Sequence, residues 1–342
     1  MRRRIENTMI VLYLIVLIVS FVILFKCADL FVTGATGLSE ILGIPKMLVG
    51  IVFVGLGTTA PEFGVSVSAA FSGFSEMALG NAIGSVIADD GIALGLAALV
   101  APAVIFVNCR ILKIAGAFLL FIDFLAYFLA RDGVLGRFEG ILFLLLLVGY
   151  FYLLYRVRGL RSGLGVPSSY DSPSGSEDAV KCSRWSRLRR PILLFVVGII
   201  GVVVASRFGV VWAAVHITEL LRIPEIIIGS TVVALGTSLP EISTCITAAR
   251  KGEGELAVGN IIGADVLNIL WIIGVAALVR PIRVDVDIIN FSFPFMILVV
   301  TVMLVSLRIG CRLTKMKGII LIVLYGAYIL LTLLLFGRPP LH

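Results

Sequence analysis

Two glutamates stand in the middle of long apolar stretches. Glu62 ends the run Gly-Leu-Gly-Thr-Thr-Ala-Pro-Glu, and Glu241 ends the similar run Ala-Leu-Gly-Thr-Ser-Leu-Pro-Glu. An acidic residue at the centre of a membrane helix costs about 3 kcal/mol, so such residues are usually kept for a function. Two of them in matching surroundings predict a functional site.

The residues before each glutamate predict a broken helix that is rich in oxygen atoms. Proline removes an amide donor and clashes with the preceding turn, and glycine loosens the backbone. We therefore expect the helix to break just before Glu62 and Glu241, which is tolerated at membrane depth only where the backbone is buried in protein or lines a cavity. The oxygens expected to face that cavity are the carbonyls of Gly55 and Ala234 and the hydroxyls of Thr58, Thr59, Thr237 and Ser238.

This set of ligands favours a hard cation. Ca²⁺ takes six to eight oxygen ligands at about 2.3–2.6 Å, from carboxylates, carbonyls and hydroxyls. Zinc or copper would favour imidazole or sulfur, but the only histidines are His216 and His342. The five cysteines contain no CxxC pair, so we expect neither a zinc site nor a disulfide framework.

The elements that must position these residues are membrane helices. Of the 342 residues, 60% are hydrophobic and only 14% are charged. About 20 apolar residues cross the hydrocarbon core of a bilayer, and ten such stretches can be drawn. They cover residues 9–36, 44–71, 76–102, 112–130, 137–156, 191–218, 224–250, 255–280, 288–308 and 317–336.

The chain contains an internal repeat. A shift of 179 residues aligns 42–102 with 221–281 without a gap, and it superimposes prolines, glycines, both glutamates and Asn81 on Asn260. Each half holds five spans, so the second half enters the membrane from the opposite side. An inverted repeat of this kind is typical of alternating access around a site near the bilayer midplane. The alternative is a duplicated structural bundle with no transport role.

A polar segment rich in Gly, Ser, Pro and Arg separates the halves. We expect a first five-helix repeat at 1–156, a flexible cytoplasmic linker at 157–190 and a second repeat at 191–342. The loops on the linker's side carry seventeen Lys and Arg, against nine on the side of the termini. Positive charge favours the cytoplasm, so a multi-pass protein of the cell membrane with both termini outside is expected, although the cluster Arg2–Arg4 argues the other way.

The doubled motif resembles the sodium/calcium exchanger family of the calcium:cation antiporter superfamily. The motif consists of Gly57–Glu62 with Gly80–Ser85, and of Gly236–Glu241 with Gly259–Ala264. The resemblance implies an all-α fold of ten membrane helices in which helices 2, 3, 7 and 8 are discontinuous. It also implies that Ser85, Asp89 and Asn268 join the oxygen ligands; the last two each lie 27 residues after their glutamate.

This sequence departs from the family pattern in the second half. Ala264 stands where the first half has Ser85, so one hydroxyl is missing and a three-for-one stoichiometry is in doubt. Asp265 follows it, either as a compensating ligand or as a group that reaches toward an aqueous vestibule. Asp90 points about 100° away from Asp89 on a helix and is expected to be structural or vestibular.

The sequence therefore predicts an antiporter that exchanges Na⁺ for Ca²⁺ at a central carboxylate site, and not an enzyme. Its partners would be Ca²⁺, Na⁺ and membrane lipid, with no cofactor and no nucleic acid, and a monomer is compatible with the pattern. The main alternative is a Ca²⁺/H⁺ exchanger of the same superfamily. A passive channel and an intramembrane hydrolase are further alternatives, but His216 has no obvious nucleophile as a partner.

Overall fold

The computed structural model describes residues 2–162, 177–213, 216–217 and 234–336, and almost all of them are helical. In the first half the elements are α1 (Arg2–Leu42), α2 (Lys46–Val49), η1 (Gly50–Val54), α3 (Gly55–Thr58), α4 (Ala60–Phe71), α5 (Ser75–Ala88), η2 (Asp89–Ala93), α6 (Leu94–Val100), β1 (Ile105–Phe106), α7 (Cys109–Ala130), β2 (Val134–Leu135) and α8 (Arg137–Ser162). In the second half they are α9 (Glu177–Val204), η3 (Ala205–Val211), α12 (Ala234–Thr237), α13 (Leu239–Arg250), α14 (Gly254–Leu267), η5 (Asn268–Ile272), α15 (Ile273–Val279), β3 (Ile282–Arg283), η6 (Ile288–Ser292), α16 (Phe293–Arg308), η7 (Ile309–Cys311), β4 (Arg312–Leu313) and α17 (Lys315–Phe336).

Within the described residues, eight helices are long and apolar enough to cross a membrane, or nine if a bent pair counts as one span. The bent pair is Lys46–Thr58 with Ala60–Phe71, at 45°. The predicted span 224–250 begins outside the described residues, where only α12 and α13 are seen. The membrane-protein class is confirmed, and the count of ten remains a prediction.

Two of the predicted discontinuities are wrong. Ser75–Val100 and Gly254–Val279 each form one helix without an interruption. The irregularity in each is a π-helical turn, η2 or η5, which begins at Asp89 or Asn268. A π-helical turn adds a residue and rotates the following side chains without ending the helix, so the break that the family resemblance implied is here a local irregularity.

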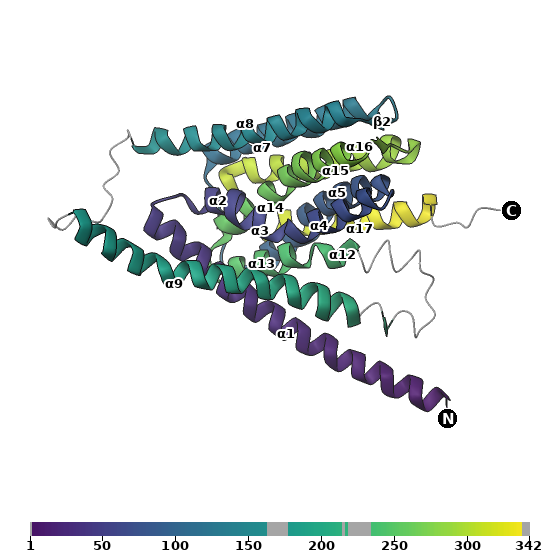
Figure 1. The fold of residues 1–342 in the computed structure, drawn as a ribbon, viewed down its shortest axis with the longest axis horizontal. Coiled ribbons are helices and arrows are strands. Elements are labelled where there is room, and N and C mark those ends of the chain that lie inside the picture. The colour runs from purple at the N-terminus through teal and green to yellow at the C-terminus, as the bar shows by residue number, and fades with distance from the viewer. Residues whose placement is uncertain (1, 163–176, 214–215, 218–233, 337–342) are drawn as a thin grey trace.

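These two helices form the centre of the bundle. In the most apolar part of each, 72% and 83% of residues are buried, against 11% in α1 and in α17. Helices α1 and α9 pack against each other along one side of the molecule (Figure 1), where Gly34 meets the backbone of Phe195 and Gly198 meets that of Phe31. Glycine removes the side chains that would hold the two helices apart.

Two short antiparallel ladders join the halves. β1 pairs with β4, with Ile105 opposite Leu313, and β2 pairs with β3, with Val134 opposite Arg283. In each ladder, the strand that follows the central helix of one half pairs with a strand between the last two helices of the other half. The start of α1 and the end of α17 lie at the same end of the molecule (Figure 1).

A disulfide joins Cys109 and Cys311, with a Cα–Cα distance of 5.5 Å. The expectation that the cysteines carry no disulfide is therefore wrong for this pair. The two residues are 202 positions apart in the sequence, and the β1–β4 ladder and the packing of α7 against α16 bring them together. Cysteine spacing along the chain carries no information about such a pairing.

Candidate functional site

The two predicted helix breaks before the glutamates are present. Thr59 separates α3 from α4 and Ser238 separates α12 from α13, with ψ angles of −8° and 4°. Pro61 and Pro240 lie in the first turn of the following helix, where a missing amide donor is tolerated. Pro240 cannot donate to the carbonyl of Gly236, and the Ser206 hydroxyl donates to that oxygen instead, at 3.1 Å. The breaks therefore lie three residues before Glu62 and Glu241.

The breaks bring the two glutamates together. Glu62 and Glu241 have no exposed surface, and their carboxyl groups lie within hydrogen-bonding reach of each other. Within the described residues, no side chain or backbone group makes a hydrogen bond of good geometry to any of their four oxygens. Ionised carboxylates only accept hydrogen bonds, so two of them cannot bond to each other. They can share only a proton or a cation placed between their oxygens. Buried charges are normally paired or coordinate a metal.

The hydroxyls of the first half approach the glutamate of the second half. The side chains of Thr58 and Thr59 lie beside the Glu241 carboxyl group, and both threonines are fully buried. The Thr58 hydroxyl is within donor distance of Asn260 Oδ1, at 3.1 Å, and of the Val54 carbonyl oxygen, at 3.2 Å. When Asn260 accepts the only hydroxyl proton of Thr58, the lone pairs of that oxygen are free for a cation.

Asn81 and Asn260 are site residues that the sequence analysis did not single out. Each contacts a threonine of the other half, since the Thr237 hydroxyl lies 3.4 Å from Asn81 Oδ1. Each also donates within its own half, from Asn81 to Ser66 at 3.0 Å and from Asn260 to Cys245 at 3.5 Å. The signal was present, because both asparagines align in the repeat.

Asp89 extends the glutamate pair. It is fully buried and interacts electrostatically with Glu241 and Glu62. The Ser238 side chain lies near its carboxyl group but makes no hydrogen bond of good geometry. The structure therefore places a third carboxyl group near the glutamate pair and the hydroxyls of Thr58, Thr59 and Ser238.

The remaining predicted ligands are less completely described. Ser85 and Asn268 are buried, and their side-chain polar atoms have no hydrogen-bond partner. The carbonyl of Gly55 accepts the Thr59 amide at 2.9 Å, which leaves one lone pair of that oxygen for an ion, so its role as a ligand stays a prediction. Gly55 also allows close packing, since a Cβ there would lie 3.2 Å from the backbone of Gly263. Ala234 begins α12 at the edge of the described residues.

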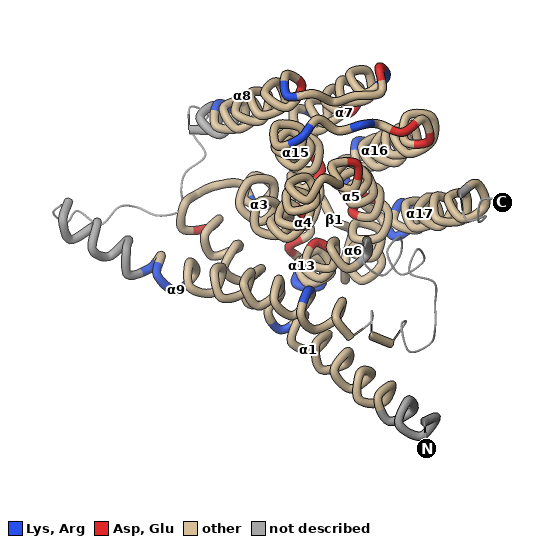
Figure 2. Tube along the Cα trace, turned by 45° about the vertical axis from the view of Figure 1, so that its right-hand side comes forward, with Lys and Arg blue, Asp and Glu red and all other residues tan. Residues whose placement is uncertain are grey.

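The described ion pairs are Lys46–Glu253 and Lys251–Asp29, and neither includes one of these carboxyl groups. In the part of the chain that the structure describes, no three acidic, imidazole or thiol side chains converge as a ready metal cage. A cation here would therefore share two carboxylates with hydroxyl and carbonyl oxygens. Figure 2 shows acidic positions in the interior of the bundle as well as at its ends.

A position at an aqueous vestibule was one of the expectations for Asp90 and Asp265, but neither side chain faces one. Both are fully buried, and their carboxyl groups lie within hydrogen-bonding reach of each other. Consecutive residues of a helix point in different directions, so Asp89 and Asp90 lie in two different environments. Asp89 interacts with Glu241, and Asp90 with Asp265.

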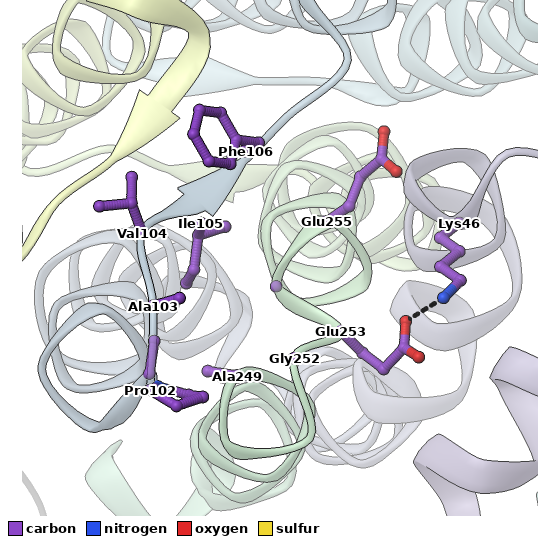
Figure 3. A pocket seen from close by; sticks show the side chains of 12 residues that line it. Lys46, Pro102, Ala103, Val104, Ile105, Phe106, Ala249, Gly252, Glu253 and Glu255 are labelled. Carbon is purple, nitrogen blue, oxygen red and sulfur yellow. Dashed lines mark ion pairs between the residues drawn. The ribbon is translucent and has the colours of Figure 1, made fainter.

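One cavity of the described structure reaches the helix breaks, and another lies apart from them. The first, of about 460 Å³, reaches both helix breaks, because Pro61, Gly236 and Thr237 line it together with Arg207 and His216. The second, of about 280 Å³, lies between β1 and the turn that joins α13 to α14, and the Lys46–Glu253 pair stands at one side of it (Figure 3). No predicted ligand lines the second cavity, so it is separate from the carboxylate site.

Comparison with known proteins agrees with this architecture. The family model described as sodium/calcium exchanger protein matches residues 12–156 and 190–334. This chain belongs to the sodium/calcium exchanger family. It is 35% identical to the inner membrane protein YrbG of Escherichia coli, over 83% of this chain and 85% of that protein. It is 28% identical to the sodium/calcium exchanger MaX1 of Methanosarcina acetivorans, over 94% and 98% of the two chains.

The exchanger fold is also seen in solved structures. The sodium-calcium exchanger NCX_Mj, soaked with Na⁺ and Sr²⁺, matches with a TM-score of 0.78 at 23% identity. The match covers 94% of this exchanger and 99% of NCX_Mj. The recognition made from the doubled motif is therefore confirmed, and the family is one of membrane transporters.

Proposed function

We propose that this exchanger moves Ca²⁺ against Na⁺ by alternating access, with Glu62 and Glu241 as the shared ligands of the transported ion. The observation that carries the proposal is the pair of buried carboxyl groups whose oxygens receive no hydrogen bond of good geometry from the described residues. Buried carboxylates of this kind require a counter-charge. A transported cation provides one that can arrive and leave.

The proposal includes an inverted repeat, and several features support it. The two helix breaks, at Thr59 and Ser238, lie at equivalent positions under the 179-residue shift, and so do the π-helical turns η2 and η5. The Asn–Thr contacts are reciprocal between the halves. The two ladders are also reciprocal. The start of α1 and the end of α17 lie at the same end of the molecule (Figure 1), and in this proposal the halves are 1–156 and 191–342, joined by a linker at 157–190.

In this proposal, the charge of the site couples the transport of Na⁺ to the transport of Ca²⁺. With Glu62, Glu241 and Asp89 ionised, the empty site carries three negative charges. Three Na⁺ would neutralise them, and one Ca²⁺ would leave one negative charge. The remaining ligands in this proposal are Ser85, Asn268, Thr58, Thr59, Thr237, Ser238 and the carbonyls of Gly55 and Ala234. The alanine at 264 removes one hydroxyl, so the number of Na⁺ ions per Ca²⁺ has to be measured.

Sliding of α1 and α9 across the rest of the bundle would change the access of the site. The two helices pack on each other through Gly34 and Gly198, so they can move as one unit. An occupied site is close to neutral and can be buried during this motion. An empty site carries several charges and resists dehydration, which favours exchange over leak.

A Ca²⁺/H⁺ exchanger is the second candidate. It is favoured by the same unpartnered carboxyl oxygens, because a proton can occupy them as well as a metal ion. The two functions differ in the gradient that drives Ca²⁺ uptake.

Flux of ⁴⁵Ca²⁺ into proteoliposomes tests the proposal. We expect an outward Na⁺ gradient to drive uptake and a pH gradient of equal size to drive little. Glu62→Gln and Glu241→Gln keep the shape of the side chain but remove a charge, so each is expected to abolish Na⁺-driven flux. Glu76→Gln, at an exposed position of α5, is the matched control and should retain it. Normal flux in both buried variants would refute the site, and uptake driven only by the pH gradient would establish the second candidate.

A further inference from the structure

A second group of buried acidic side chains lies beside the exchange site. Asp90 of η2, Asp265 of α14 and Asp123 of α7 are all fully buried. Asp265 interacts electrostatically with both of the others, and none of the six carboxyl oxygens receives a hydrogen bond of good geometry from a non-acidic group of the described residues. Neither described ion pair includes these aspartates. Three uncompensated carboxyl groups in a bundle interior are costly, so this group requires a positive charge.

A tyrosine that belongs to no other site also points to a ligand. Tyr150 of α8 is 1% exposed, and its hydroxyl has no hydrogen-bond partner. It interacts electrostatically with Asp265, and its ring stacks on Phe118 with a centroid distance of 4.6 Å. Buried tyrosine hydroxyls usually find a partner. The Tyr150 ring is fixed by stacking. Its hydroxyl has no hydrogen-bond partner among the described residues and interacts electrostatically with the Asp265 carboxyl group.

The second group breaks the symmetry of the repeat. Under the 179-residue shift, Asp90 corresponds to Ile269 and Asp265 to Val86. Both counterparts are apolar, whereas Glu62 and Glu241 correspond to each other. The aspartates are therefore an addition on one side of the pseudo-two-fold axis, and they are not needed for the packing that the two halves share.

We propose that Asp90, Asp265 and Tyr150 form a second cation site that binds Na⁺, with Asp123 contributing negative charge behind it. Carboxylate and hydroxyl oxygens suit a hard cation. Ca²⁺ takes six to eight ligands, and these three side chains offer fewer oxygens, which favours a singly charged ion that is also less costly to dehydrate. Through Asp89, which interacts with both Glu241 and Asp90, Na⁺ here would act on the exchange site. This inference rests on the proposed Na⁺ coupling.

Binding of ²²Na⁺ to the purified full-length protein tests the second site separately from the first. In the Glu62→Gln/Glu241→Gln background, where the exchange site is disabled, we expect the protein to retain one Na⁺ per chain. Adding Asp265→Asn should remove it, and adding Asp285→Asn, at an exposed position, should not. Retained Na⁺ in the Asp265→Asn protein would overturn the second site while leaving the exchange site untouched.

A milder substitution covers the case in which Asp265→Asn does not fold. Tyr150→Phe keeps the stacked ring and removes only the hydroxyl, so we expect Na⁺ affinity in the same background to fall by about tenfold. Tyr152→Phe, on the exposed side of the same helix, is the control. Unchanged Na⁺ affinity in Tyr150→Phe would overturn the proposal. A change only in the pH dependence of flux, with Na⁺ binding intact, would also overturn it and assign the aspartates to protons.

Discussion

At the scale of single residues, the proposed exchange site consists of carboxyl groups that receive no hydrogen bond of good geometry from the described residues. Glu62, Glu241 and Asp89 are buried with no hydrogen-bond partner, whereas Thr58 is held by Asn260. The contrast matters because a side chain whose hydrogen bonds are made can orient a ligand, whereas a carboxylate without a donor gains its partner only when an ion binds. The asparagines are positioning residues in this account.

Replacement of Asn260 tests that role. In Asn260→Leu the Thr58 hydroxyl loses its acceptor and can turn to the carbonyl of Val54, so its lone pairs no longer face the site. We expect the Ca²⁺ affinity of the purified protein to fall by roughly three- to tenfold, the value of one hydrogen bond. Asn260→Asp retains an acceptor oxygen and should keep the orientation of Thr58. Asn290→Leu, at an exposed position, is the control, and an unchanged affinity in Asn260→Leu would contradict the role.

Some of these residues could be predicted from sequence and others could not. Glu62 and Glu241 were evident because acidic residues at membrane depth are rare and because both follow a proline. The contact of Asp90 with Asp265 was not evident. It depends on the phase of the π-helical turn at Asp89, which shifts side chains relative to a regular helix, and on how two distant helices cross.

At the scale of elements, the helix α1 is tied to the turn after α13. Lys251 Nζ lies 2.8 Å from Asp29 Oδ1 and donates to Thr33 Oγ1 at 2.6 Å. This contact joins the proposed moving unit to the rest of the bundle. The pair Lys46–Glu253, at 2.6 Å, joins two parts of the bundle that would not move relative to each other.

Breaking the first pair should therefore shift the conformational equilibrium, and breaking the second should not. A partly exposed ion pair contributes up to about 1 kcal/mol, so Lys251→Met is expected to change the ratio of the two access states by up to about fivefold. Distance distributions between spin labels on α1 and α13 measure this ratio. Lys46→Met is the matched control. Equal distributions in wild type and Lys251→Met would show that α1 does not move against this turn.

The elements themselves were well predicted, because apolar length identifies a span and proline identifies a break. The bend at Thr59 and the interruption at Ser238 follow from Pro61 and Pro240. The discontinuities that the family resemblance implied in the two central helices are only π-helical turns, and glycine there serves close packing: Gly259 and Gly263 meet the backbone of Met47 and Ile51.

At the scale of the whole molecule, the two halves are interlocked. The reciprocal ladders β1–β4 and β2–β3 each use one strand from either half, and the Cys109–Cys311 disulfide reinforces only the first. A bundle held in this way can remain rigid while α1 and α9 move. Neither the ladders nor the disulfide could be predicted, because both are contacts between segments far apart in the sequence.

The central claim is that one ion is held jointly by the two halves through Glu62 and Glu241. Calorimetric titration of Ca²⁺ into purified wild type, Glu62→Gln, Glu241→Gln and the double variant tests it most directly. Because both carboxylates would hold the same ion, we predict that each single substitution removes the binding seen in wild type and that the double variant loses nothing further. Ca²⁺ binding that survives in each single variant, and disappears only when both glutamates are replaced, would contradict a shared site.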